Sequence, residues 1–199
     1  MNILLMMLIV SSSSFAFRSE LTAKDWEKLN RGETIERVEE LKDEVFPQVT
    51  LVSVIPYSPH ENMKVFTNFN DHKNFIPGML QSKIVKVKGN VTDVYFEMYM
   101  PMVKNTEYTT RHTVIFEGKN AFLDWDLVKS DQVKRTKGKI VFEDHEGKTL
   151  FTYVSLITPK SKLAWVVKNQ VLPDVKKTIE AVKSHLAKTI EAQRKNSPD

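Results

Sequence analysis

The thirty residues from Val49 to Gly78 constrain the fold of this chain more than any other segment. Val49–Ile55 is rich in β-branched residues, which is typical of a strand. Ser58 comes shortly afterwards, with Pro59 next to it and Glu61 three residues later. That spacing is typical of a helix that begins with a capping box. The pattern therefore predicts a strand that turns directly into a helix.

A second short helix is expected behind the first. Apolar residues recur at helical spacing from Met63 to Phe69,. Asn70 and Asp71 are candidate N-caps for the next helix, which Pro77–Gly78 would end. A strand, two short helices and then many strands form an unusual order. It places a helical lid on a curved sheet, and it predicts a cavity beneath that lid.

The chain from residue 79 to residue 158 consists of alternating segments separated by turn signals. Short turns rich in Gly, Asn, Ser and Asp join these segments, which predicts one antiparallel meander. The expected strands are 81–88, 91–100, 107–117, 121–129, 133–143 and 148–158.

Helices are expected at both ends of the chain. The segment 21–29 reads as a short helix capped by Thr22, and 33–41 as an edge strand. From Ser161 onward, apolar residues recur at intervals of three and four, which predicts an amphipathic helix of about thirty residues, kinked or restarted at Pro173. These apolar residues are Leu163, Trp165, Val166, Leu172, Val175, Ile179, Val182, Leu186 and Ile190.

The first sixteen residues read as a signal peptide. Ile3–Val10 is an uninterrupted apolar run, and Ser14 and Ala16 fit the small-residue positions of a cleavage site,. The run is shorter than the roughly 20 residues of a membrane span. We therefore expect cleavage after Ala16 and a periplasmic or secreted protein, although Met1–Asn2 lacks the usual basic residue. The alternative is the apolar start of a cytoplasmic chain.

The expected organisation is one domain with appendages. Residues 1–16 are the signal peptide, 17–44 an N-terminal extension, 45–193 the main domain and 194–199 a disordered tail. The 199 residues include no cysteine, which excludes a disulfide, a thiol nucleophile and a zinc–thiolate site.

Sequence motifs for catalysis or metal binding are not found in this chain. The five histidines show no metal-ligand spacing, and Asp71–His72 falls at a predicted turn, where solvated side chains are usual. No nucleophile elbow, phosphate loop or dinucleotide fingerprint occurs. We therefore predict no catalytic residue, no metal site and no cofactor.

The order of these motifs resembles the START-like superfamily, also called SRPBCC, with its polyketide cyclase/dehydrase and coenzyme Q-binding members. The resemblance covers about residues 47–190. The matching residues are Val52–Ile55, Ser58–Glu61 with Val65–Phe66, Asn70–Asp71 with Asn74–Pro77, Ser82 with Ile84–Val85, Trp125, Gly138, Gly147–Thr149 with Tyr153, and Leu172–Pro173. The resemblance implies an α+β helix-grip fold, in which a curved antiparallel sheet wraps a long C-terminal helix. It also implies a pocket for a lipid, sterol or quinone, but no single activity.

Strand alternation and the expected lid together select the candidate ligand-binding residues. Met and aromatic side chains suit an adaptable apolar pocket, although any one of them could instead simply pack against the last helix. The candidates are Phe66, Phe69, Phe75, Ile76, Phe96, Met98, Met100, Arg111, Phe116, Leu123, Trp125, Leu127, Phe142, Tyr153, Trp165 and Leu172.

Polar residues on the neighbouring strands have two interpretations. An inward Trp125 places Asp124 and Asp126 outside, so an Arg111–Asp126 ion pair is expected on the outer surface. In the enzyme alternative, Tyr153 or Arg111 acts inside the pocket.

The leading hypothesis is an exported, non-catalytic carrier or sensor of a hydrophobic ligand. A cyclase/dehydrase enzyme and a protein-interaction module are the alternatives. Lys160–Lys195 carries nine basic and three acidic residues, against a net charge of +4 for the whole chain. That excess fits a solvated helix face or docking on an anionic membrane surface. No nucleic-acid partner is expected, and the oligomeric state is left open.

Overall fold

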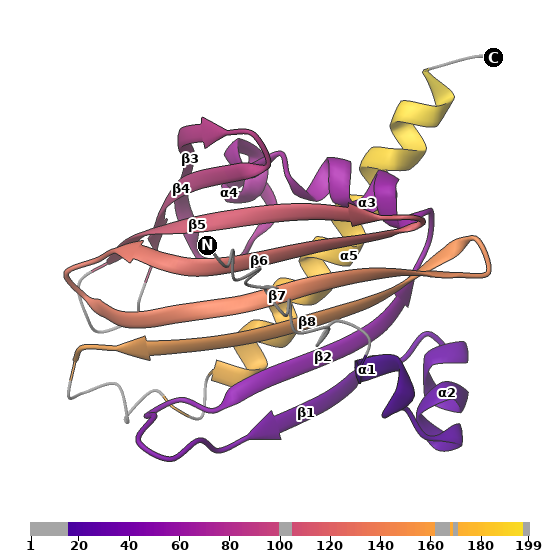
Figure 1. Ribbon diagram of the computed structural model, residues 1–199, viewed down its shortest axis with the longest axis horizontal. Helices are drawn as coiled ribbons and strands as arrows, with labels where there is room; N and C mark the ends of the chain where they lie inside the picture. The colour runs from indigo at the N-terminus through magenta and orange to yellow at the C-terminus, as the bar shows by residue number, and fades with distance from the viewer. Residues whose placement is uncertain (1–15, 100–104, 162–167, 169–170, 197–199) are drawn as a thin grey trace, which may run out of the picture.

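The computed structural model describes residues 16–99, 105–161, 168 and 171–196. Within these residues, the centre of the fold is a single sheet of eight antiparallel strands, with one long helix lying across it (Figure 1). The strands are β1 (Ile35–Glu39), β2 (Gln48–Ile55), β3 (Met79–Lys88), β4 (Val91–Met98), β5 (Thr106–Glu117), β6 (Asn120–Lys129), β7 (Val133–His145) and β8 (Lys148–Pro159). The helices are α1 (Ala16–Ser19), α2 (Ala23–Asn30), α3 (Pro59–Phe66), the 3₁₀ turn η2 (Phe69–Asp71), α4 (His72–Phe75) and α5 (Val171–Lys195).

The strand order is β1-β2-β8-β7-β6-β5-β4-β3. Strands β3 to β8 form the predicted meander. Strand β2, the first strand of the expected core, pairs with β8, the last strand, and β1 forms the edge of the sheet beyond β2. The curved sheet and the long C-terminal helix confirm the predicted α+β helix-grip fold.

The turn from β2 into α3 is built as the sequence predicts. The side chain of Ser58 accepts a hydrogen bond from the backbone N–H of Glu61, whose carboxylate accepts one from the backbone N–H of Ser58 at 3.0 Å. Asn62, fully buried, donates to the carbonyl of Pro56 at 2.9 Å and to Oγ1 of Thr149 on β8 at 3.0 Å. These bonds, all made by the amide nitrogen of Asn62, fix α3 to the sheet, while its Oδ1 has no hydrogen-bond partner in the described structure.

The second short helix is present, and Asp71 occupies its N-cap position as predicted, but the expected capping hydrogen bond is not formed. Neither Asn70 nor Asp71 makes a side-chain capping hydrogen bond. Instead, Oδ1 of Asn70 accepts from the backbone N–H of Ile84 on β3 at 2.8 Å, and the carboxylate of Asp71 accepts from the side chain of Asn74. Tertiary contact with β3 therefore replaces local capping.

The main core lies between the sheet and α5. The helix buries one stripe, formed by Ile179, Val182, Leu186 and Ile190, at the spacing that the sequence predicts,. The described part of α5 runs from Val171 to Lys195, with Pro173 near its start. Residues 162–167 and 169–170, on which the predicted start of this helix falls, lie outside the described part.

The C-terminal end of α5 corrects a second prediction. The expected disordered tail began at residue 194, but α5 continues to Lys195. Arg194 donates to Glu61 on α3 at 2.7 Å, and its guanidinium lies 4.7 Å from the ring centroid of Tyr57. These contacts hold the last helical turn against α3.

The N-terminal extension covers part of the outer face of the sheet. The predicted helix and edge strand are confirmed as α2, with a capping box between Thr22 and Asp25, and as β1. Leu29 and Ile35 form a small second core with Val52 and Leu150. The extension therefore buries apolar strand residues that would otherwise face solvent.

No helix in the described part of the chain is long and apolar enough to span a membrane.

Candidate ligand-binding cavity

A cavity of about 220 Å³ lies between the inner face of the sheet and α5. Aromatic and aliphatic side chains make up most of its wall, with some hydroxyl groups and two histidines. The lining residues are Phe66, His72, Ile76, Met79, Phe96, Tyr108, Thr110, His112, Leu123, Trp125, Thr136, Ile140, Tyr153, Ser155, Ile157, Val175, Thr178, Ile179 and Val182. None of these described residues is Lys, Arg, Asp or Glu. The described part of the wall is therefore mostly apolar and carries no fixed charge.

The lid is the segment that contains η2, α4 and Ile76, and it is held in place by a contact with α5. His185 on α5 stacks on the ring of Phe75 in α4, with centroids 3.9 Å apart, and its Nε2 lies 3.3 Å from the carboxylate of Asp71. Ile76 follows α4 directly and lines the cavity. The contact thus joins the segment that covers the cavity to the helix that forms its floor.

His72 is the buried polar residue of the lid. Its side chain is 3% exposed, and Nε2 lies 2.8 Å from the carbonyl oxygen of Phe66. Burial lowers the pKa of His72 to about 4, against the opposing effect of the hydrogen bond to Phe66,. The ring is therefore neutral at pH 7.

His112, on β5, is the second histidine of the cavity wall. Its Nε2 is 2.8 Å from Oγ1 of Thr110, and its Nδ1 is buried without a hydrogen-bond partner in the described structure. Burial lowers the pKa of His112 to about 3. An unpartnered polar atom in such a place is unusual in a folded protein and calls for an explanation.

The wall of the sheet is shaped by Trp125 and Gly138, which are register partners on β6 and β7. A Cβ atom on Gly138 would lie 2.3 Å from Cζ2 of Trp125 and 2.2 Å from the carbonyl oxygen of Val154. The glycine therefore leaves the space that the indole ring occupies.

Two tyrosines add hydroxyl groups to the wall. The ring of Tyr153 lies 5.6 Å from that of Trp125, and the ring of Tyr108 lies 5.6 Å from that of Phe96. Burial raises the pKa of Tyr108 and that of Tyr153, with a hydrogen bond from Ser155 opposing it in the second case. Both hydroxyls are protonated at neutral pH and serve as neutral hydrogen-bonding groups.

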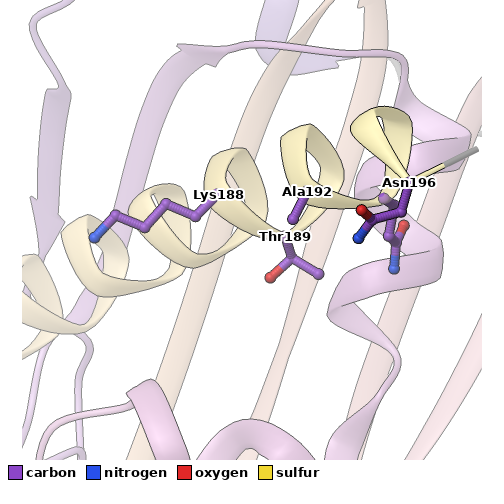
Figure 2. A pocket seen from close by; sticks show the side chains of 5 residues that line it. Lys188, Thr189, Ala192 and Asn196 are labelled. Carbon is purple, nitrogen blue, oxygen red and sulfur yellow. The ribbon is translucent and has the colours of Figure 1, made fainter.

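Two other depressions lie on the outside of the molecule. Figure 2 shows Lys188, Thr189, Ala192 and Asn196 along the last turns of α5, where they line an open hollow of about 470 Å³. The second hollow, of about 420 Å³, lies over Gly138 and is bordered by charged side chains of β6 and β7. No cluster of His, Cys, Asp or Glu able to hold a metal occurs among the described residues. The central cavity is therefore the candidate site.

The structure brings six of the predicted ligand-binding residues into the cavity wall. They are Phe66, Ile76, Phe96, Leu123, Trp125 and Tyr153. Others pack beside the cavity in the main core: Phe69, Phe142, Phe75 and Leu172. Met98 and Leu127 are half-buried outside the wall, and Met100 and Trp165 lie outside the described residues. Direct contact with a ligand is still a prediction for every one of them.

Two of the predicted site residues lie away from the cavity. Arg111 points to the outer surface, where its guanidinium pairs with Asp93 at 2.8 Å and 2.9 Å and not with Asp126 as expected. Asp126 is also a register partner of Arg111, but from the strand on the other side. This hydrogen-bonded arginine holds the pKa of Asp93 below its usual range. Phe116 is 52% exposed at the end of β5, against the ring of His60 on α3.

The sequence analysis missed the two histidines. His72 was assigned to a solvated turn, but α4 and its burial against Phe66 place it inside the molecule. His112 has the same strand parity as the inward residues of β5, and Trp125 lies opposite it in the register. An inward Trp125 therefore implies an inward His112, so the sequence alone already contained the information that places His112 in the cavity wall.

Comparison with known proteins identifies the fold. No protein-family model matches the sequence, and a search of curated proteins finds no significant match. Solved structures do match. A STAR-related lipid transfer protein from Xanthomonas axonopodis superposes with a TM-score of 0.70 at 16% identity, over 77% of this chain and 93% of that one. The chain therefore has the START-like fold.

Two further structures show how widely the START-like fold is used. Human StAR-related lipid transfer protein 5 gives a TM-score of 0.63 at 8% identity, covering 84% of this chain and 93% of that one. The ZhuI aromatase/cyclase from Streptomyces gives 0.62 at 8% identity, covering 72% and 94%. The START-like fold thus occurs in proteins named for lipid transfer and in one named as an enzyme, so the fold alone does not decide the activity.

Proposed function

We propose that this protein binds a hydrophobic small molecule in its central cavity and acts as a carrier or sensor. The observation that carries the proposal is the cavity of about 220 Å³, whose described wall is mostly apolar and has no charged side chain. Its volume is below the roughly 300–1,000 Å³ of typical ligand pockets, so the ligand is compact or inserts only one segment. The lipid-transfer names of the Xanthomonas and human structures support the same proposal.

The test uses 1-aminoanthracene, a small neutral fluorophore, with the purified chain. We expect saturable binding that is lost in Thr178→Phe, because Thr178 lies on the cavity side of α5 and a phenyl ring would fill the void. Thr189→Phe is the matched control, since Thr189 lies on the same helix in the outer hollow. Equal binding by both variants, or none by the wild type, would contradict the proposal.

An enzyme of the cyclase/dehydrase type is the second candidate. It is favoured by polar side chains that converge on the cavity, namely His72, His112, Tyr108 and Tyr153. Buried histidines with lowered pKa values are weak bases, which favours the carrier,. Mass spectrometry of compounds extracted from the protein separates the two: a ligand recovered unchanged after incubation supports a carrier, and turnover supports an enzyme. A filled interior would have favoured an interaction module, so the cavity counts against that function.

Export is part of the same proposal. The apolar run that ends at Ala16 supports a cleaved signal peptide,. Expression of the full chain in a bacterium, followed by cell fractionation and intact-mass measurement, tests it. A periplasmic or secreted product that begins at Phe17 is expected. A full-length product confined to the cytoplasm would contradict export.

An anionic membrane surface is the remaining partner to test. Several basic side chains of α5 already have acidic partners, for example Lys176 with Glu36 at 2.7 Å and Arg194 with Glu61 at 2.7 Å. This favours the solvated helix face over membrane docking. The test is co-sedimentation with vesicles that contain about 30% phosphatidylglycerol, in a buffer of about physiological salt concentration. Little protein is expected to sediment with the vesicles. Strong, salt-sensitive recovery would support docking instead.

A further inference from the structure

The polar part of the cavity wall has a definite hydrogen-bonding pattern. The rings of His72 and His112 both lie against Phe69, at centroid distances of 5.3 Å and 4.5 Å. Both also lie about equally far from Phe96, at 6.2 Å and 6.0 Å. The two histidines therefore line the same cavity and share two aromatic neighbours.

His72 offers an acceptor. A carbonyl oxygen only accepts hydrogen bonds, so Nε2 of His72, which lies 2.8 Å from the carbonyl of Phe66, carries the hydrogen,. In a neutral imidazole the other nitrogen is then an acceptor. No described residue donates a hydrogen bond to that Nδ1.

His112 offers a donor. If Nε2 of His112 donated to Thr110, both the hydroxyl hydrogen of Thr110 and Nδ1 of His112 would be without partners. If Thr110 donates to Nε2 instead, only one group is left over, the N–H at Nδ1. The second arrangement leaves fewer buried polar groups unpaired, so it is favoured.

We infer that the cavity selects an uncharged molecule with a hydroxyl group, which donates to Nδ1 of His72 and accepts from Nδ1–H of His112. This inference rests on the proposed function and names the ligand class for the same cavity: a neutral aliphatic or alicyclic alcohol. A hydroxyl donates and accepts at once, so it gives a hydrogen-bond partner to Nδ1 of both histidines. A ketone only accepts, so it gives a partner to His112 alone. A carboxylate brings a charge into a wall that has no cationic partner among the described residues, which is costly,.

The test compares 1-decanol, 2-decanone and decanoate, which share one chain length, by calorimetry on the delipidated protein at pH 7.5. We expect 1-decanol to bind about fivefold more tightly than 2-decanone, as one neutral hydrogen bond provides, and decanoate to bind more weakly than either. Equal or tighter binding of the ketone or of decanoate overturns the inference while leaving the proposed function intact. Binding of none of the three overturns both.

Variants separate the two histidines. His72→Phe removes the acceptor and keeps a ring, so the preference for the alcohol over the ketone should fall from about fivefold to none. His112→Phe removes the donor that both ligands use, so both affinities should fall about equally and the preference should persist. Thr189→Val is the matched control, because Thr189 lies on α5 in the outer hollow and not in the cavity wall, and it should leave the preference unchanged. An unchanged preference in a folded His72→Phe protein overturns the assignment; if that variant does not fold, the wild-type preference and His112→Phe decide.

Discussion

The indole ring of Trp125 lies so close to Gly138 that a Cβ atom on the glycine would come within 2.3 Å of the ring. The two residues are register partners on β6 and β7, and the ring forms part of the cavity wall. Gly138 is therefore needed for the shape of the cavity.

Gly138→Ala should have two effects: it should destabilise the protein and change the cavity. The new methyl group meets both the indole ring and the carbonyl of Val154, and overpacking of this kind costs about 1–3 kcal/mol,. Urea unfolding measures the loss, and 1-aminoanthracene binding reports the cavity. Ser155→Ala, which shortens a neighbouring side chain of the same wall, should cost less. A Gly138→Ala protein with wild-type stability would show that the strands can separate to admit the methyl group.

The two buried histidines should make the protein less stable as the pH falls. Each is neutral in the folded state, with a pKa of about 4 for His72 and about 3 for His112, whereas the unfolded chain binds a proton near pH 6.5,. Their contribution is complete above pH 6.5 and is lost progressively toward pH 4 and pH 3. At pH 5 each histidine should have reduced the free energy of unfolding by about 2 kcal/mol.

Urea titrations at pH 8, 6 and 5 measure this loss. His112→Phe removes one of the three histidines whose pKa is lowered in the folded protein, the others being His72 and the less buried His185, so its stability should fall less steeply over this range. Burial raises the pKa of Asp124 and that of Glu143, but both carboxyl groups are present in wild type and variant, so their contribution cancels in the comparison. The same slope in wild type and variant would place the source of the pH dependence elsewhere.

Local signals predicted most of the fold, and long-range contacts account for what they missed. Ser58 and Glu61 form their capping box because both partners lie within one turn. Asn70 carries the same kind of local signal, yet it bonds to Ile84 on β3, which no local pattern contains. His72 shows the same limit, since its burial depends on how α4 packs against α3 and the sheet.

The alternation of side chains along the strands predicted which residues face the cavity, but not how far along each strand the cavity extends. Leu123 and Trp125 face the cavity as alternation predicts. Phe116 follows the same alternation on β5, but it lies beyond the region that α5 covers and is exposed. Alternation gives the face of a strand. How far the covering helix extends along it depends on the tertiary structure.

Arg111→Gln should leave ligand binding unchanged. Its guanidinium is on the outer face and is bound to Asp93, so the variant removes no group from the cavity. The measurable change should be a rise in the pKa of Asp93 toward its usual value, because the arginine is the main cause of its depression. Carboxyl chemical shifts followed by NMR through an acid titration report it. A loss of 1-aminoanthracene affinity in the folded variant would restore Arg111 as a ligand-binding residue.

Leu29→Ala should weaken the fold without affecting the cavity. Leu29 is 2% exposed and packs with Ile35, Val52 and Leu150 on the outer face of the sheet. Removing a buried leucine side chain costs about 2–5 kcal/mol. Urea unfolding should show this loss while the affinity for 1-aminoanthracene stays the same, and Lys24→Ala on the exposed side of α2 should change neither. A large change in affinity would couple the N-terminal extension to the site.

His185→Ala should speed the escape of a bound ligand. His185 joins α5 to the lid in two ways, by stacking on Phe75 with planes only 8° apart and by the contact of its Nε2 with Asp71. Without the ring, the segment that carries Ile76 over the cavity loses its contact with the helix beneath it. Stopped-flow release of 1-aminoanthracene should therefore be faster than in the wild type.

Two further variants identify which contact holds the lid. His185→Phe keeps an aromatic ring against Phe75 and removes the polar contact with Asp71, so a release rate near that of the wild type would assign the effect to stacking. Asp71→Asn weakens the charge contact and keeps the stack, which gives the complementary measurement. If His185→Ala releases the ligand at the wild-type rate, the ligand leaves by a route that does not require the lid to separate from α5.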